Sequence, residues 1–295
     1  MINEITLKAW LVTNKYYISD SFLTLKKHLI EAASKKGIEL IVHNNVDIVK
    51  VIANVNYAKP DFVLFWDKDI KLASFLESDG IKVFNSSESI RICDDKSHTF
   101  LKLRNKGIKQ PKTFFSPLLF YHNMTENDEI LDFIIGELGL PFVFKECFGS
   151  FGKQVSLVSS KSEFIEKIKK ADTWPYIMQE FITSSFGKDL RLYVVGDKVI
   201  ASMKRENSSG DFRANIEVGS IGTAYDPSDE QKELAIKVVK ELGLSFGGID
   251  ILFGKDGEPV FCEANSNAYF NEINKVTNIR VEDHIFDYIV KYMCA

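Results

Sequence analysis

The sequence predicts an α/β and α+β protein, with an N-terminal parallel-sheet domain over residues 1–92 and two further lobes over residues 93–182 and 183–295. Short apolar runs alternate with helix-like stretches in the first third, which is typical of a parallel sheet. Paired apolar runs joined by glycine-containing turns dominate the rest, which indicates antiparallel sheets. At 295 residues and 45% hydrophobic content, the chain can bury cores in two or three lobes.

The first third reads as a βαβα segment. Between its first two apolar runs, the stretch SFLTLKKHLIEAASKKG has helical periodicity and closes on Gly37, since glycine commonly ends a helix. We therefore expect a small parallel sheet in this domain. Its strands are predicted at AWLV, ELIVH, DFVLFW and IKVF, residues 9–12, 39–43, 61–66 and 81–84.

The two later lobes mix hairpins and single helices. The middle lobe is predicted to hold a helix ending near Gly107, helices at 127–138 and 161–170, and strands at PFVFKE, QVSLV and YIMQEFI. In the last lobe, DLRLYVVG and KVIASMKR form a hairpin that turns at Gly196 and Asp197. A second hairpin, GIDILF with PVFCEA, lies between helices at 228–242 and 281–293.

Composition excludes several classes of protein. Lys plus Arg number 37 against 41 Asp plus Glu, a net charge of −4, which gives no electrostatic reason to expect nucleic acid or an anionic membrane as a partner. No apolar run reaches the roughly 20 residues of a membrane-spanning helix, and no signal-peptide pattern follows Met1. We expect a cytoplasmic protein. Its four cysteines lack CxxC spacing and are expected to be reduced and mostly structural.

The second hairpin of the last lobe carries three oxygen-bearing side chains. Asp250 lies in its first strand, and Glu263 and Asn265 lie in its second. An antiparallel pairing would let Asp250 face Glu263, and carboxylates with an amide form an oxygen set suited to Mg²⁺ (or Mn²⁺). The alternative is that all three are polar residues on the wet face of a hairpin.

A glycine-containing loop follows Lys145 near the end of the strand PFVFKE. Its residues Gly149, Ser150, Phe151 and Gly152 can turn successive backbone N–H groups toward phosphate oxygens. The loop is not a Walker motif, because the GxxxxGK[ST] spacing is missing and a strand follows. The alternative is an ordinary hairpin turn.

Two further groups of polar residues suit a nucleotide. Glu180 ends one strand, and Asp189 begins the next, where a carboxylate can accept protons from ribose hydroxyls; a surface pair of Asp189 with Arg191 is the alternative. Cationic residues also cluster around a flexible loop, where they can neutralise a triphosphate or a developing acyl phosphate. The alternative is a basic loop that faces solvent. The residues around this loop are Lys204, Arg205, Arg213 and Asn215.

Taken in order, these segments resemble the ATP-grasp carboxylate-amine ligases, and among them the RimK-type branch that adds amino acids to carboxylates. The resemblance covers residues 94–267 and rests on seven segments in the family's order. They are DDKSHTF, PFVFKECFGSFGKQV, MQEFI, KDLRLYVVGDKVIASMKR, GDFRANIEVG, GIDILF and FCEANSN. It implies an ATP-grasp fold with an N-terminal pre-grasp domain.

The resemblance also implies a role for each matching residue. Lys96 and Lys145 would contact ATP phosphates, and the loop from Gly149 to Gly152 would close over them. The remaining roles are an adenine pocket at Glu180 and Phe181, a ribose contact at Asp189, phosphate contacts at Arg213 and Asn215, and one or two Mg²⁺ at Asp250, Glu263 and Asn265. The resemblance implies catalytic roles for Arg213, Lys145 and Arg205.

The implied reaction is ATP-dependent amide formation. A carboxylate receives the γ-phosphoryl group, and an amine, expected to belong to an amino acid, displaces the phosphate from the acyl phosphate. The carboxylate would belong to a peptide, a protein or a small metabolite, and the resemblance also implies a homo-oligomer. A non-catalytic ATP-binding regulator and a grasp-fold kinase remain as alternatives.

The chain departs from the family at one position near the expected acceptor. Many RimK-type members have a proline-glycine turn after NSN, whereas this chain has Ala268, Tyr269, Phe270 and Asn271. These residues are expected to change the floor of the acceptor pocket. In the N-terminal domain, the segment from Asn14 to Tyr17 follows the first strand, where it can help to hold the substrate.

Overall fold

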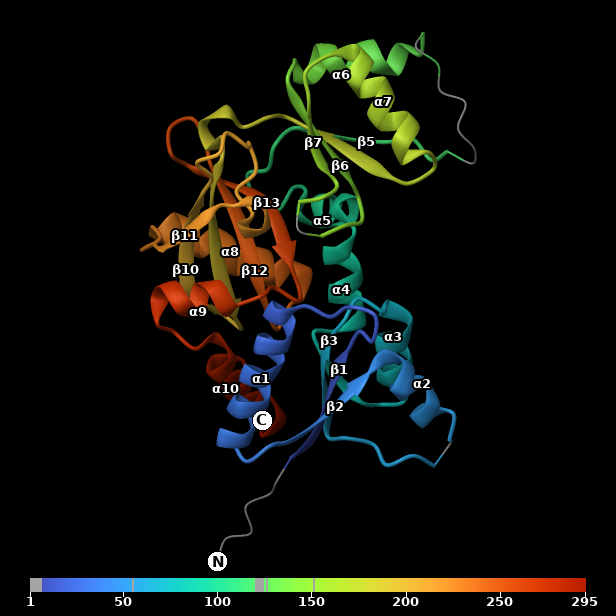
Figure 1. Ribbon diagram of the computed structural model, residues 1–295, viewed down its shortest axis with the longest axis vertical. Coiled ribbons are helices and arrows are strands. Elements are labelled where there is room, and N and C mark those ends of the chain that lie inside the picture. The colour runs from blue at the N-terminus through green and yellow to red at the C-terminus, as the bar shows by residue number, and fades with distance from the viewer. Residues whose placement is uncertain (1–6, 55, 120–124, 126, 151) are drawn as a thin grey trace, which may run out of the picture.

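The structure is a computed structural model that describes residues 7–54, 56–119, 125, 127–150 and 152–295. Three sheets follow one another along the long axis of the molecule (Figure 1). A four-stranded parallel sheet lies at one end, a five-stranded antiparallel sheet in the middle, and a four-stranded antiparallel sheet at the other end. The predicted α/β and α+β classes are confirmed.

The N-terminal sheet has the strand order β2-β1-β3-β4, and all its neighbours are parallel. The hydroxyl of Ser19 accepts a hydrogen bond from Phe22 N and so caps the first helix, as serine commonly does. The strands are β1 (Lys8–Thr13), β2 (Glu39–Asn44), β3 (Phe62–Trp66) and β4 (Lys82–Phe84), close to the predicted ranges. The helices are α1 (Asp20–Lys35), α2 (Asn45–Ile52), α3 (Ile70–Ser78) and α4 (Ser87–Asp94).

The four-stranded antiparallel sheet, which we call the central sheet because it comes from the middle of the sequence, has the order β5-β8-β6-β7 and its own core. Phe142, Phe144 and Tyr176 are buried in that core against Phe164 of a covering helix. Its strands are β5 (Thr113–Phe115), β6 (Phe142–Glu146), β7 (Val155–Val158) and β8 (Tyr176–Gln179). The helices of this region are α5 (Lys96–Leu103), α6 (Glu129–Leu138) and α7 (Lys161–Ala171).

The C-terminal sheet has the order β11-β10-β9-β12-β13 and contains both predicted hairpins. Ser228 and Gln231 form a capping box at the start of its longest helix. The strands are β9 (Lys188–Val195), β10 (Lys198–Glu206), β11 (Ile221–Ala224), β12 (Phe246–Phe253) and β13 (Pro259–Asn265). The helices are α8 (Asp229–Leu242), α9 (Asn271–Thr277) and α10 (Val281–Met293).

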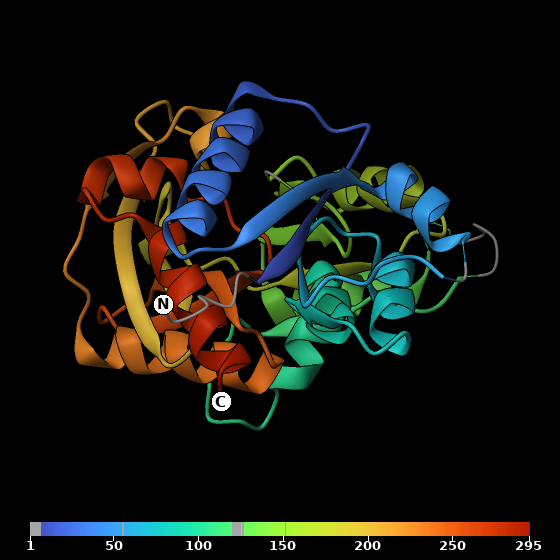
Figure 2. The same ribbon diagram turned by 90° about the horizontal axis from the view of Figure 1, so that it is seen from below.

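The N-terminal and C-terminal sheets share one hydrophobic core. Leu25 and Leu29 of α1 belong to the same buried cluster as Ile285 and Phe286 of α10, and the two helices lie side by side (Figures 1 and 2). Fully buried Asn85 joins the same parts, because its Nδ2 donates to Phe246 O at 2.9 Å and to Ser266 O at 2.8 Å. The N-terminal sheet is therefore held firmly against the C-terminal sheet.

No helix in the described part of the chain is long and apolar enough to cross a membrane.

Candidate functional site

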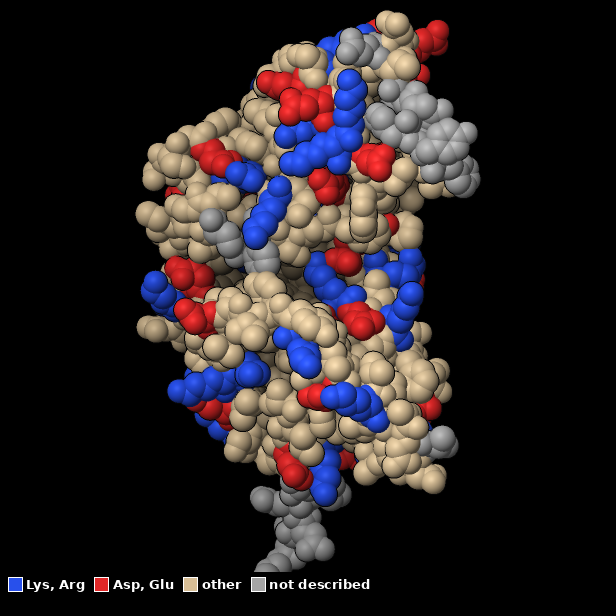
Figure 3. Space-filling model, turned by 45° about the vertical axis from the view of Figure 1, so that its right-hand side comes forward, with Lys and Arg blue, Asp and Glu red and all other residues tan. Residues whose placement is uncertain are grey.

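Two adjoining cavities lie between the sheets. The larger, of about 450 Å³, is lined mainly by residues of the N-terminal and C-terminal parts, together with Gly149 and Ser150, and we call it the large cavity. The smaller, of about 100 Å³, is lined by residues of the central and C-terminal sheets, and we call it the small cavity. Figure 3 shows a recess about half-way along the molecule with basic side chains at its rim. Arg205, Asn215 and Glu263 line both cavities, so the two spaces meet at these side chains.

Most of the predicted site residues line these cavities. Those in the small cavity are Lys96, Lys145, Gly152, Glu180, Phe181, Asp189, Arg213 and Asp250, besides the three shared residues. Gly149, Ser150 and Asn265 line the large cavity. Lys204 lines neither: it alternates with Arg205 along β10, and its Nζ lies 2.7 Å from Glu206 Oε1. Phe151 lies outside the described residues.

The expected hairpin of β12 and β13 places its acidic residues face to face. Asp250 is the direct cross-strand neighbour of Glu263, and Gly248 that of Asn265. Gly257 makes the turn at φ +86°, a conformation that favours glycine. Glu263 keeps 29% of its side chain exposed, and its Oε1 lies 3.5 Å from Lys96 Nζ.

Asp250 differs from Glu263 in being buried among arginines. Arg191 donates to both its carboxylate oxygens, through Nε to Oδ1 and through Nη2 to Oδ2 at 2.7 Å, and Arg205 Nη2 lies 3.1 Å from Oδ2. Burial by itself would raise the pKa of Asp250, but the two guanidinium groups outweigh it and hold that pKa below its usual range. This carboxylate therefore stays ionised inside the protein.

Arg205 also binds Asp189. Its Nε donates to Oδ1 at 2.7 Å and its Nη2 to Oδ2 at 2.5 Å, a bidentate pair in which both side chains are at most one-tenth exposed. Asp189 thus pairs with Arg205 and not with its sequence neighbour Arg191. The alternative of a surface Asp189–Arg191 pair is wrong for this chain. Both side chains are buried, and Arg191 binds Asp250 instead.

The hairpin residues fit a hard divalent cation. They offer it oxygen ligands, namely the carboxylates of Asp250 and Glu263 at facing positions of the strand pair and the amide oxygen of Asn265 two residues further along β13. No group of three or more His, Cys, Asp or Glu side chains suited to a metal is found in the described part of the chain, so the amide of Asn265 would have to complete the set. A cation at Asp250 would share its carboxylate with Arg191 and Arg205.

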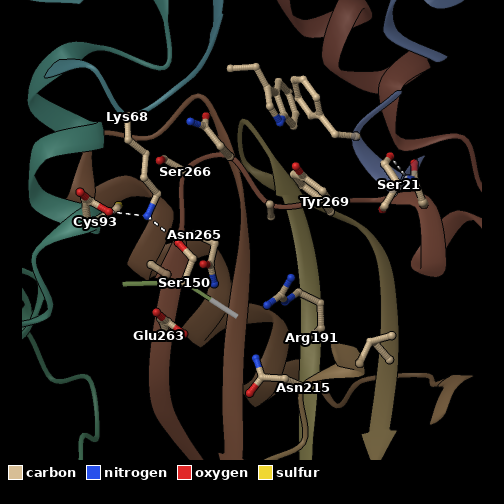
Figure 4. A pocket seen from close by; sticks show the side chains of 18 of the residues that line it. Ser21, Lys68, Cys93, Ser150, Arg191, Asn215, Glu263, Asn265, Ser266 and Tyr269 are labelled. Atoms are coloured by element: carbon tan, nitrogen blue, oxygen red, sulfur yellow. Dashed lines mark hydrogen bonds and ion pairs between the residues drawn. The ribbon is translucent and has the colours of Figure 1, made fainter. Parts of the chain in front are cut away.

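Among the described residues, three cations contact the loop between β6 and β7. Arg213 Nη1 donates to Gly152 O at 2.8 Å, Lys96 Nζ to Gly149 O at 3.5 Å, and Lys68 Nζ to Ser150 Oγ at 3.1 Å (Figure 4). These cations come from the C-terminal, central and N-terminal parts of the chain. Gly152 adopts φ +68°, a conformation that favours glycine, and a Cβ there would lie 2.8 Å from Asn215 Oδ1.

Residues at and just after the end of β8 line part of the small cavity. Glu180 forms a backbone hydrogen bond from its N to Lys112 O at 2.9 Å, and Phe181 packs edge-on against Phe186 and Phe212. Lys145 Nζ lies 3.9 Å from Cys262 Sγ on β13. The rings of Phe181 and Phe212 give this cavity part of its apolar lining, and lysines and arginines also line it.

The large cavity contains residues that the sequence patterns did not single out. Trp66, Asp67 and Lys68 lie at the carboxyl end of β3, where ligands commonly bind in parallel sheets, and this position is the signal that could have found them. In the segment after β1, Asn14 and Tyr17 line the cavity, whereas Lys15 and Tyr16 do not. Among the residues that replace the family's turn, Ala268, Tyr269 and Asn271 line it, whereas Phe270 is buried in the core.

Comparison with known proteins gives matches over most of the chain. The model of the RimK-like ATP-grasp domain matches residues 93–289. A probable alpha-L-glutamate ligase of Maridesulfovibrio salexigens is 37% identical over 72% of this chain and 68% of its own length. Human N-acetylaspartylglutamate synthase A is 34% identical over 77% of this chain, which spans 57% of that enzyme. A D-alanine–D-alanine ligase structure from Bacillus anthracis superposes with a TM-score of 0.75 at 17% identity, over 98% of this chain and 97% of that one, which shows the fold alone.

Proposed function

The chain belongs to the RimK-like ATP-grasp family, whose named members here are amino acid ligases, and from this membership we propose that it joins a carboxylate to the amine of an amino acid at the expense of ATP. We propose further that the reaction passes through an acyl phosphate and releases ADP and phosphate.

The meeting of the two cavities is the observation that carries the proposal. A ligase of this kind needs a nucleotide site and an acceptor site that open onto one another where the phosphoryl group is transferred. Arg205, Asn215 and Glu263 occupy that junction. The lining of the small cavity, aromatic and cationic, suits the adenine and the phosphates of ATP, which would have to widen this space of about 100 Å³ on binding, and the large cavity suits the two substrates that are joined.

In the proposed reaction, the protein chiefly positions the substrates and neutralises charge. The oxygen of the substrate carboxylate attacks the γ-phosphorus, and ADP leaves. The amine then attacks the acyl carbon, phosphate leaves, and the nitrogen loses a proton. Lys96, Lys145 and Arg213 would neutralise phosphate oxygens, because each has its cationic group beside the small cavity. Mg²⁺ held by Asp250, Glu263 and Asn265 would add positive charge on the phosphates.

We propose L-glutamate as the amine substrate. The names of the relatives support it, because one is a probable alpha-L-glutamate ligase and another makes N-acetylaspartylglutamate. The carboxylate partner would be a peptide, a protein or a small metabolite.

ADP release tests the proposal. The purified chain is incubated with Mg-ATP, L-glutamate and a dialysed cell extract as the source of carboxylates, and products are read by mass spectrometry. We expect a new species that is heavier than its precursor by glutamate minus water, with one ADP formed per product. ATP binding without extract-dependent ADP would indicate a regulator instead, and a phosphorylated product stable to added amines would indicate a kinase.

A further inference from the structure

One buried carboxylate in the large cavity has no cationic partner among the residues that the structure describes. Asp67 is 8% exposed and lies in the cavity wall. Its hydrogen bonds come from uncharged donors, namely Asn14 Nδ2 at 3.1 Å to Oδ1 and 3.3 Å to Oδ2, and Lys68 N at 2.7 Å. Within the described residues, no Lys, Arg or His nitrogen lies within 4.0 Å of its oxygens.

The other charged groups deep in this cavity are paired. Lys68 Nζ, which Figure 4 shows turned toward Ser150, is bound to Asp94. Arg191 is bound to Asp250, and Glu263 lies 3.5 Å from Lys96. Asp67 is thus the place where the wall offers an uncompensated negative charge. A buried charge is costly unless it is paired, so a cationic ligand group would be favoured there.

The surroundings of Asp67 supply a second acceptor. Asn267 lines the same cavity and donates from Nδ2 to Asp67 O at 2.8 Å, which places its amide beside this residue. Its Oδ1 is buried and has no hydrogen-bond partner in the described part of the chain. A ligand that brings N–H donors to this wall would satisfy both the carboxylate and, after a small turn of the amide, this oxygen.

Burial raises the pKa of Asp67, against the effect of the hydrogen bonds from Asn14 and Lys68 N, while the neighbouring Asp69 raises it further. The surroundings of Asp67 therefore disfavour its ionised form, and a bound cation would stabilise that form.

We infer that Asp67 is the recognition site for the amino group of the substrate, which enters the large cavity as a primary ammonium and pairs with this carboxylate. The inference rests on the proposed function, and it names the residue by which the enzyme would tell an amino acid from the corresponding acid without nitrogen. Asp67 is here a specificity-determining residue: it holds the ammonium on entry, before the nitrogen loses a proton and reacts.

The test compares binding of L-glutamate with that of glutarate, which is glutamate without its amino group. Calorimetric titrations use the wild-type chain with Mg²⁺ and a non-hydrolysable ATP analogue. We expect the wild type to prefer glutamate, and Asp67→Asn to lose about tenfold or more of glutamate affinity while binding glutarate as before. Unchanged affinity for the ATP analogue would show that the variant is folded.

Asp69→Asn is the matched control. Asp69 caps α3 through a hydrogen bond from Leu72 N, a position where asparagine serves equally well, and it does not line the large cavity. It removes the same charge from the same turn, so it should keep the wild-type preference for glutamate. If both variants lose the preference for glutamate over glutarate equally, the loss results from the reduced negative charge of the turn and not from Asp67 itself. The inference would then be wrong.

Two further outcomes separate this inference from the proposed function. If the wild type forms a glutamate adduct but Asp67→Asn keeps its preference for glutamate over glutarate, the inference is overturned and the ligase proposal stands. If the wild type yields no adduct with any of the twenty amino acids, the ligase proposal fails, and the inference that rests on it fails with it.

Discussion

Asp250 on β12 and Glu263 on β13 are direct cross-strand neighbours, yet they lie in different surroundings. Asp250 is 2% exposed and bound by arginines, whereas the Glu263 side chain is 29% exposed between two cavities. The strand pairing brings both carboxylates to one face, and the neighbouring strands β9 and β10 supply arginines to only one of them. Glu263 is therefore the carboxylate more accessible to a cation.

Glu263→Gln is expected to lower the rate of ADP formation by roughly 100-fold or more, because it removes the accessible negative charge at the junction of the cavities. Initial rates at saturating Mg-ATP measure the effect. Glu258→Gln, in the turn of the same hairpin, is the control and should keep its rate, since Glu258 pairs with Lys109 and lines neither cavity. Normal ADP formation by Glu263→Gln would contradict the metal assignment.

Lys145→Met is expected to weaken ATP binding about tenfold to 100-fold, since a charged hydrogen bond to phosphate would be lost. Titration with a fluorescent ATP analogue measures this. Lys153→Met removes an exposed lysine from the turn before β7 and should bind ATP like the wild type. Equal affinities of the two variants for the ATP analogue would show that Lys145 does not bind phosphate.

Arg205→Met is expected to lower the free energy of unfolding by about 3–5 kcal/mol, because Asp189 and part of Asp250 would be left buried without compensation. Urea denaturation followed by circular dichroism gives this value. Lys204→Met, its neighbour on β10, breaks a partly exposed pair and should cost less than about 1 kcal/mol. A fully stable Arg205→Met would mean that the cluster relaxes or takes up water.

Asn85→Ala is expected to lower the free energy of unfolding by about 2–4 kcal/mol. Its side chain accepts from Ser245 N at 2.7 Å and donates to two backbone carbonyls, and alanine would leave these groups buried and unpaired. Thermal and urea unfolding provide the measurement, with Asn56→Ala, at an exposed position, as the control. Equal stability of the two variants would show that this contact does not hold the two sheets together.

Alkylation of the cysteines should depend on burial and pH. Burial raises the pKa of Cys147 to about 11 and that of Cys93 to about 12, so both stay neutral thiols at pH 8 and react slowly. Cys294 is exposed and should be labelled first. Peptide mass spectrometry after timed iodoacetamide treatment follows each site. Labelling of Cys147 should rise as the pH approaches 11, and rapid labelling at pH 8 would contradict its burial.

Much of the local structure followed from periodicity and turn chemistry. The predicted antiparallel hairpin put Asp250 opposite Glu263, and the glycine-containing loop was expected between two strands, as observed. Short elements were missed: β5 has three residues, and α2 has eight that follow β2 without a break. Such segments are too short for a periodic signal to separate them from loops.

The sequence by itself determined the order of elements, the two C-terminal hairpins and the family resemblance, because these depend on neighbours along the chain. Only the tertiary structure decided that Asp189 pairs with Arg205 and Asp250 with Arg191, that the two cavities meet at Glu263, and that Asp67 has no cationic partner among the described residues. Pairing and burial of charges depend on which strands and loops become neighbours in space, and the energy of a charge depends on those surroundings.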